Sequence, residues 1–272
     1  MDSSLARVTS TSRSRVEFAF AQDNARWPWQ DLHPQHPVAL NMYFYFAPIT
    51  ALIALELATP ELQTALTRLE WTCPELREPM MASTGACTFP GIDTKDRSFS
   101  VDLWTRSGEL LAHAEGKGVA FATRDFAAWR AGTKAQIQAG AAPGDIPRAT
   151  PAQLGLGDGW EPFVSPPEQD GDRQIFRALV TRKEGFPPAH RFHAGSGDHV
   201  NVGHLTDCAL QAAHLIRGVP LRCIGGVAEF RRYVELDCPF ELRLTEDGEA
   251  LRFQGTQSGH DCFELELHVV AS

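Results

Sequence analysis

The stretch Gly203-His204-Leu205-Thr206-Asp207-Cys208-Ala209-Leu210-Gln211-Ala212-Ala213-His214-Leu215-Ile216 is a mostly apolar run that contains one carboxylate. A helix of this sequence is apolar on nearly every side, so it must be buried on nearly every side. Asp207 and Gln211 are four residues apart and therefore share a helix face. A buried carboxyl is costly unless it is paired or protonated, and its pKa can rise until it donates protons at neutral pH. The alternative is an Asp in the first helical turn, where the dipole favours it.

Composition limits the classes of function. The 272 residues permit one large domain or two ordinary ones, and 43% hydrophobic residues suffice for a core. The formal net charge of -9 argues against broad nucleic-acid binding. We expect no membrane span, because no apolar run reaches the required length. Residues 1–14 are rich in Ser and Arg and predict a flexible tail, not a secretory signal. We therefore expect a cytoplasmic protein.

Cysteine and histidine spacing gives little support for a metal site. The six cysteines form no Cys-x-x-Cys pair, so neither a zinc site nor a disulfide framework is indicated. We expect reduced thiols, with Cys208 as a small buried residue and not a nucleophile. The loop before the apolar run is rich in histidine, but no pair has the helical i, i+4 spacing of a zinc protease. Its polar residues are His190, His193, Asp198, His199, Asn201 and His204.

The order of predicted elements occurs twice. Residues 15–130 and 173–272 each begin with a strand, pass through a loop into one mostly apolar helix, and end in alternating segments. Period-two alternation around Ser107-Gly108 and Asp247-Gly248 turns predicts antiparallel hairpins. Between the halves, residues 131–172 are rich in Gly, Ala, Pro and Gln and predict a linker. In each half, one sheet curled around one helix would bury the helix, which we expect at residues 49–58 and 204–216.

This order resembles the hotdog fold, in which an antiparallel sheet wraps a central helix, and two copies in one chain resemble the double hotdog. The resemblance implies an α+β protein: two antiparallel sheets, each wrapping a long central helix, packed as a pseudo-dimer. The two helices open in a similar way, with Ile49-Thr50-Ala51-Leu52 in the first half and Leu205-Thr206-Asp207-Cys208 in the second.

The segment Asp207-Cys208-Ala209-Leu210-Gln211 looks like the Asp-x-x-x-Gln motif of polyketide-synthase dehydratase domains. In that family the Asp and a His from the first half remove water from a 3-hydroxyacyl thioester. The His takes the alpha proton, the acid protonates the departing hydroxyl, and backbone N–H groups polarise the carbonyl. The resemblance implies that Asp207 is the acid and Gln211 its orienting partner. It also implies a substrate carried on an acyl carrier protein or CoA, with no bound cofactor.

The first half departs from this family. The His-x-x-x-Gly-x-x-x-x-Pro run that should precede the helix, aligned on Pro48, places its His at Ala39 and its Gly at Tyr43. The nearby histidines are His36, which we favour as the base, and His33. A loop histidine bonded to the backbone is the alternative.

Polar residues around the second helix are expected to meet the substrate. Those expected to line the acyl pocket are His199, Asn201, Gly203 and His204. Local positive charge could bind a phosphopantetheine phosphate or an acidic carrier protein, although a solvated, charged edge strand would look the same. The cations concerned are Arg217, Arg222, Arg231 and Arg232.

Three functions stay open at this point. The first is a dehydratase that acts on a 3-hydroxyacyl thioester. The second is a thioesterase in which Asp207 and Gln211 activate water against the thioester carbonyl, without a first-half His. The third is a non-catalytic protein that binds or shapes an acyl chain for cyclisation. We expect neither nucleic acid nor membrane as a partner, and a homodimer is possible.

Overall fold

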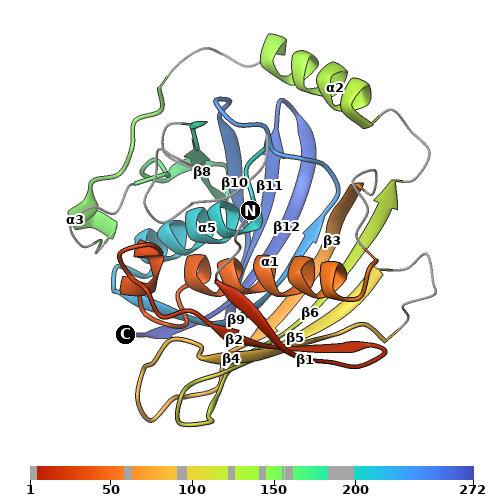
Figure 1. The fold of residues 1–272 in the computed structure, drawn as a ribbon. Coiled ribbons are helices and arrows are strands. Elements are labelled where there is room, and N and C mark those ends of the chain that lie inside the picture. The colour runs from red at the N-terminus through yellow and green to blue at the C-terminus, as the bar shows by residue number, and fades with distance from the viewer. Residues whose placement is uncertain are drawn as a thin grey trace. The chain divides into compact units, whose positions relative to one another are not determined.

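The chain divides into two compact units, Met1–Phe126 and Ala127–Ser272. The computed structural model describes residues 5–57, 63–90, 97–121, 126–140, 145–154, 156, 162–182 and 199–272. Antiparallel strands and a few helices make up each unit, in agreement with a hotdog fold (Figure 1).

In the first unit the described strands form one antiparallel sheet in the order β1-β2-β4-β5-β6-β3. The long helix α1 packs on β1, β2, β4 and β5 of this sheet. The elements are β1 (Ala6–Thr11), β2 (Arg15–Phe20), the 3-10 helix η1 (Pro28–Asp31), α1 (Pro37–Ala54), β3 (Gln63–Thr72), β4 (Thr84–Thr88), β5 (Arg97–Trp104) and β6 (Leu110–Phe121).

In the second unit the described strands follow the order β7-β8-β10-β11-β12-β9, again antiparallel throughout. The helix α5 packs on β9 and β12 and is touched by α3. The elements are α2 (Phe126–Gly140), α3 (Pro151–Leu154), β7 (Glu168–Asp170), β8 (Arg173–Ala178), α5 (Val202–Arg217), β9 (Leu221–Phe230), β10 (Phe240–Asp247), β11 (Ala250–Gln257) and β12 (His260–Ala271).

The two strand orders describe one topology used twice. In each unit the first two strands form an edge hairpin, the long helix follows, and the next strand lies at the opposite edge of that unit's sheet. The remaining three strands fill the middle in chain order. The repeated element order that the sequence predicts is therefore confirmed.

Helix α1 begins earlier than the sequence predicts, at Pro37 and not at Ile49. His36 caps it, because the ring accepts a hydrogen bond from the backbone N–H of Val38, and Pro37 fills the first turn, where its missing N–H is harmless. Pro48, which marked the expected start, lies inside the helix, where burial of the surrounding apolar residues outweighs one missing hydrogen bond.

The apolar length of α1 also corrects the expectation about membrane spans. By length and composition alone, Pro37–Ala54 could cross a membrane, with a mean hydropathy of 1.4. However, 56% of this stretch is buried in the folded chain, as in the core helix of a folded domain, which passes the same test.

Residues 6–11, expected in the flexible tail 1–14, form strand β1. Ala6 pairs with Phe20 and Val8 with Phe18 on β2, and Leu5 and Ala6 are buried. The Ser, Thr and Arg side chains that suggested a tail are mostly those that face solvent from this edge strand. A polar edge strand and a polar tail have similar compositions, so composition could not separate them.

Much of the expected linker 131–172 belongs to the second unit. Helix α2 covers its first ten residues, and Phe163 and Val164 are buried. Val164 bridges Ala178 at the end of β8, and its carbonyl accepts the N–H of Ala149. The hydrogen bond from Ala149 to Val164 joins residues that are distant in sequence, and such contacts leave no periodic pattern.

In each unit a glycine and a phenylalanine lie directly opposite each other on neighbouring strands. Phe99 on β5 lies opposite Gly116 on β6, and Gly255 on β11 lies opposite Phe263 on β12. A Cβ atom at either glycine would overlap the facing ring. Glycine is therefore required at both places for the space it leaves.

Candidate functional site

Helix α5 carries the candidate site of the second unit. The Asn201 side chain accepts a hydrogen bond from the N–H of His204 at 3.1 Å and caps the start. Gly218, at φ +66°, ends the helix in the left-handed conformation that favours glycine. Every residue from Gly203 to Ala213 is buried, as the nearly all-apolar sequence predicts.

Asp207 lies in the second turn of α5, inside the buried stretch. Its side chain and that of Gln211 are each only 1% exposed. The Gln211 amide donates to Asp207 Oδ2 at 3.2 Å. Burial raises the pKa of Asp207 well above its ordinary value, and the Gln211 hydrogen bond opposes this only in part. The first-turn interpretation does not apply, and the raised pKa favours the protonated carboxyl that a proton donor requires.

The buried segment around Phe163 fixes the orientation of Gln211. The backbone N–H of Phe163 donates to Gln211 Oε1 at 2.7 Å, so the amide nitrogen must face Asp207. The ring of Phe163 meets the ring of His204 edge-on, with centroids 6.1 Å apart. Sequence reasoning missed Phe163, because a backbone donor leaves no signal in residue identity.

The residues expected to line an acyl pocket have mainly structural contacts. His204 is fully buried one turn before Asp207, and Gly203 is buried beside it. Asn201 is the helix cap. The ring of His199 packs edge-on against Tyr233 with centroids 4.5 Å apart. The structure thus brings His204, Asp207 and Gln211 together through Phe163, while His199 joins a different cluster.

The two candidate bases lie at the start of α1 in the first unit. His36 Nδ1 accepts the N–H of Val38 at 3.2 Å, and His33 Nδ1 accepts the N–H of Gln35 at 3.2 Å. A ring nitrogen that accepts a hydrogen bond carries no proton, so each neutral ring holds its proton on Nε2. Both histidines therefore make the backbone contacts of the alternative interpretation, and His36 has a clear role as a helix cap.

Two of the four arginines in the expected cluster of positive charge, Arg217 and Arg231, are paired with acids. Arg217 lies 2.8 Å from Asp247 and also donates to the carbonyl of Gly248 at 2.7 Å. Arg231 lies 2.8 Å from Glu264. Arg222 lies on β9, opposite Val270 of β12. These contacts favour the interpretation of charged, solvated strands over a phosphate site.

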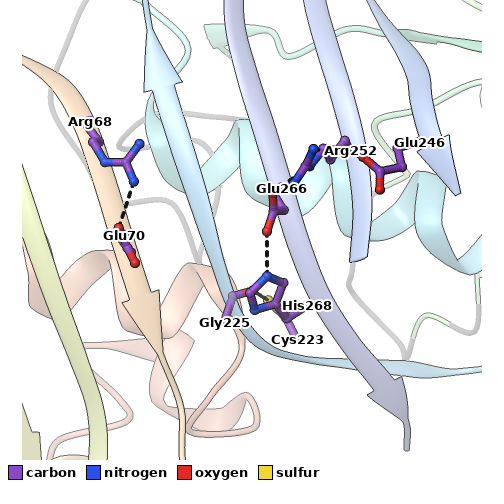
Figure 2. Close-up of polar contacts among 8 residues, drawn as sticks. All are labelled: Arg68, Glu70, Cys223, Gly225, Glu246, Arg252, Glu266 and His268. Carbon is purple, nitrogen blue, oxygen red and sulfur yellow. Dashed lines mark hydrogen bonds and ion pairs between the residues drawn. The ribbon is translucent and has the colours of Figure 1, made fainter. Parts of the chain in front are cut away.

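Ion pairs between basic and acidic side chains also lie on other strands (Figure 2). Arg252 lies 2.9 Å from Glu246 and 2.6 Å from Glu266, and His268 lies 2.7 Å from Glu266. The hydrogen bond from His268 is the main reason that the pKa of Glu266 is lowered. In the first unit, Arg68 and Glu70 on β3 pair in the same way at 2.8 Å. Cations on these strands are therefore neutralised locally.

Within the residues that the structure describes, no three His, Cys, Asp or Glu side chains are grouped to hold a metal ion. His190, His193 and Asp198 of the histidine-rich loop lie outside the described residues. The six cysteines are all buried free thiols. Burial raises the pKa of Cys262 to about 11, which disfavours the reactive thiolate there.

No protein-family model matches the sequence, and no curated protein matches it. The solved 12:0-ACP thioesterase from Umbellularia californica is 12% identical with a TM-score of 0.58, covering 97% of this chain and 100% of that one. An acyl-ACP thioesterase from Bacteroides thetaiotaomicron is 7% identical with a TM-score of 0.57, covering 94% and 97%.

The dehydratase domain from the CurK module of curacin polyketide synthase is 13% identical with a TM-score of 0.54, covering 100% of this chain and 99% of that one. The fold is thus that of hotdog thioesterases and of a polyketide-synthase dehydratase domain. Two further solved structures are inactive variants of the CurK dehydratase, one with an aspartate changed to asparagine and one with a histidine changed to phenylalanine.

Proposed function

We propose that this protein is a double hotdog enzyme that dehydrates a 3-hydroxyacyl thioester. The observation that carries the proposal is Asp207, a buried carboxyl whose pKa is raised by burial and which is oriented by Gln211. A dehydratase of the same fold loses activity when an aspartate becomes asparagine. The repeated strand order of the two units supports a double hotdog.

The proposed reaction is an elimination in which every proton has a place. A base removes the proton alpha to the thioester carbonyl, and that electron pair forms the new carbon–carbon double bond. The bond to the 3-hydroxyl breaks as Asp207 donates its proton, so water leaves and the carboxylate remains. The base then releases the alpha proton to solvent, and Asp207 takes up a proton from solvent, so both groups return to their starting states. These steps need only side chains, so the proposal includes no bound cofactor, and phosphopantetheine of a carrier protein or CoA carries the acyl chain.

The base in this proposal is His36, with His33 as the second choice. His36 Nδ1 accepts the N–H of Val38, so the neutral ring has its proton on Nε2. The ring can take the alpha proton only after Nδ1 leaves the N–H of Val38, because a ring proton moved to Nδ1 would also break that hydrogen bond. The inactive histidine variant of the CurK dehydratase shows that one relative of this fold needs such a residue.

Thioester hydrolysis is the second candidate. It needs no histidine from the first unit, so the backbone contacts of His33 and His36 do not count against it. Two thioesterases share the fold. In hydrolysis Asp207 would activate water as a carboxylate, whereas its burial favours the neutral acid. Dehydration should therefore decline, and hydrolysis should rise, as pH increases through the raised pKa of Asp207.

The test supplies matched 3-hydroxyacyl and saturated acyl thioesters, each on CoA and on a carrier protein, and reads the products by mass. We expect loss of water from the hydroxyacyl substrate, and Asp207→Asn to reduce this turnover by about a hundredfold or more, the contribution of a positioned acid. Asp261→Asn, at a surface acid that accepts a hydrogen bond from Gln254, is the matched control.

Parent-level turnover in Asp207→Asn would overturn the assignment of the acid. Release of free acid from either substrate, abolished in Asp207→Asn, would establish the thioesterase instead. Binding of both substrates without any product would support the non-catalytic, acyl-shaping function.

A further inference from the structure

A buried ion pair joins helix α2 to Glu235, which lies between β9 and β10 of the second unit. The side chain of Arg130 is 5% exposed and that of Glu235 is 0% exposed. The guanidinium binds the carboxylate with both arms, at 2.5 Å from Nη1 to Oε1 and 3.0 Å from Nη2 to Oε2. Two charges remain buried only with such geometry, and a buried pair adds little net stability over apolar residues of the same size. A role in fixing position would account for it better.

Further hydrogen bonds fix the backbone at Glu235. Its N–H donates to Gln257 Oε1 at 2.7 Å, and Gln257 Nε2 donates to the carbonyls of Glu235 at 3.0 Å and Cys238 at 2.9 Å. Gln257 is itself buried at the end of β11. The carboxylate that receives Arg130 therefore belongs to a residue whose backbone is held by hydrogen bonds to the end of β11.

The residues next to Glu235 reach the start of α5. The Arg130 guanidinium lies 4.3 Å from the ring centre of Tyr233, whose other contacts include the His199 ring at 4.5 Å. His199 forms a β-bridge with Glu235, and the N–H of Val200 donates to the carbonyl of Val234 at 2.8 Å. The next residue, Asn201, caps the helix that carries Asp207.

We propose that Arg130 is a positioning residue: through Glu235 and Tyr233 it fixes residues 199–201, and with them the start of α5. This inference rests on the proposed function, because the start of α5 presents backbone N–H groups and lies just before Asp207, the acid of the proposed reaction. Because this ion pair joins α2 to a residue 105 positions later, we expect a disturbance of α2 to change the geometry of residues 199–201.

The first test changes Tyr233, which is only partly buried, so that the ion pair stays intact. Tyr233→Leu removes the ring between Arg130 and His199, and Tyr233→Phe keeps it as the matched control. In Tyr233→Leu we expect amide hydrogen exchange at residues 200–206 to quicken about tenfold. We also expect kcat to fall about tenfold with KM nearly unchanged, as misplacement of reacting groups produces. Tyr233→Phe should match the parent in both measurements.

The second test removes the charges together. Arg130→Met alone would strand a buried carboxylate and unfold the unit, so Arg130→Met is combined with Glu235→Leu, which should restore the melting temperature. A merely structural pair predicts parental exchange and kcat in this double variant, whereas a positioning pair predicts fast exchange and low kcat despite restored stability. Parental exchange at residues 200–206 in the double variant would overturn the inference, whatever Tyr233→Leu shows. If the parent has no thioester activity, the proposed function fails, and the exchange data still decide this one.

Discussion

Replacing Gln211 with leucine tests whether the amide connects Asp207 to the backbone as the structure indicates. Gln211 accepts the N–H of Phe163 at 2.7 Å and donates to Asp207 at 3.2 Å. Leucine has a similar volume and makes neither hydrogen bond. The buried N–H of Phe163 would lose this acceptor, and Asp207 would lose the donor that partly opposes the rise of its pKa.

The magnitude follows from these two contacts. A buried donor that loses its acceptor costs about 1–3 kcal/mol, and the second hydrogen bond contributes about 0.5–1.5 kcal/mol. The extra apolar carbon of leucine offsets part of this by about 1 kcal/mol. We therefore expect a net loss of about 2 kcal/mol, which lowers the melting temperature by roughly 4–8 °C in a chain of this size.

Denaturant and thermal unfolding of Gln211→Leu, together with turnover of the hydroxyacyl thioester, provide the measurement. The matched control is Gln254→Leu, which removes a solvent-exposed hydrogen bond from glutamine to Asp261 and should cost less than about 0.5 kcal/mol. Equal stability losses in the two leucine variants would refute the assigned role of Gln211.

Three further predictions concern titration and capping. Asp207→Asn should be more stable than the parent at mildly alkaline pH. The pKa of Asp207 is raised in the folded state, so the parent loses stability as pH rises above 3.8. The difference in melting temperature between the variant and the parent should therefore close as pH falls toward 3.8. His36→Ala should lose about 0.5–2 kcal/mol of stability with the cap of α1, whereas His36→Asn keeps the cap; dehydration that survives in His36→Asn would exclude this ring as the base. Burial lowers the pKa of His214 below 6.5, so the parent should lose stability as pH falls below 6.5, and a melting curve series of His214→Gln should show a shallower loss.

The sequence was a good guide where one local run decides the outcome. Nearly every position of α5 is apolar, so its burial and the shared face of Asp207 and Gln211 follow from helical geometry alone. The repeated element order followed from alternation and turns. The start of α1 did not, because Pro37 and Pro48 both suit a first helical turn, and only packing decides which one occupies it.

Contacts between distant residues could not be predicted in the same way. The donor that orients Gln211 is a backbone N–H of Phe163, and any residue except proline could supply it. Nothing in the sequence pairs Arg130 with Glu235, which lies 105 positions further along the chain. Their meeting depends on the completed fold of the second unit.

The glycine–phenylalanine pairs constrain how this protein can diverge. At Gly255 even a methyl group would occupy the space of the Phe263 ring, and the same holds for Gly116 and Phe99. A single change at either glycine is therefore disfavoured until its aromatic partner has become smaller. Among sequences of common descent, the two members of each pair should covary. A position that replaces the phenylalanine with a smaller residue should be matched by a larger residue in place of the glycine. A search for such paired changes could detect relatives whose residue identity is too low to reveal them.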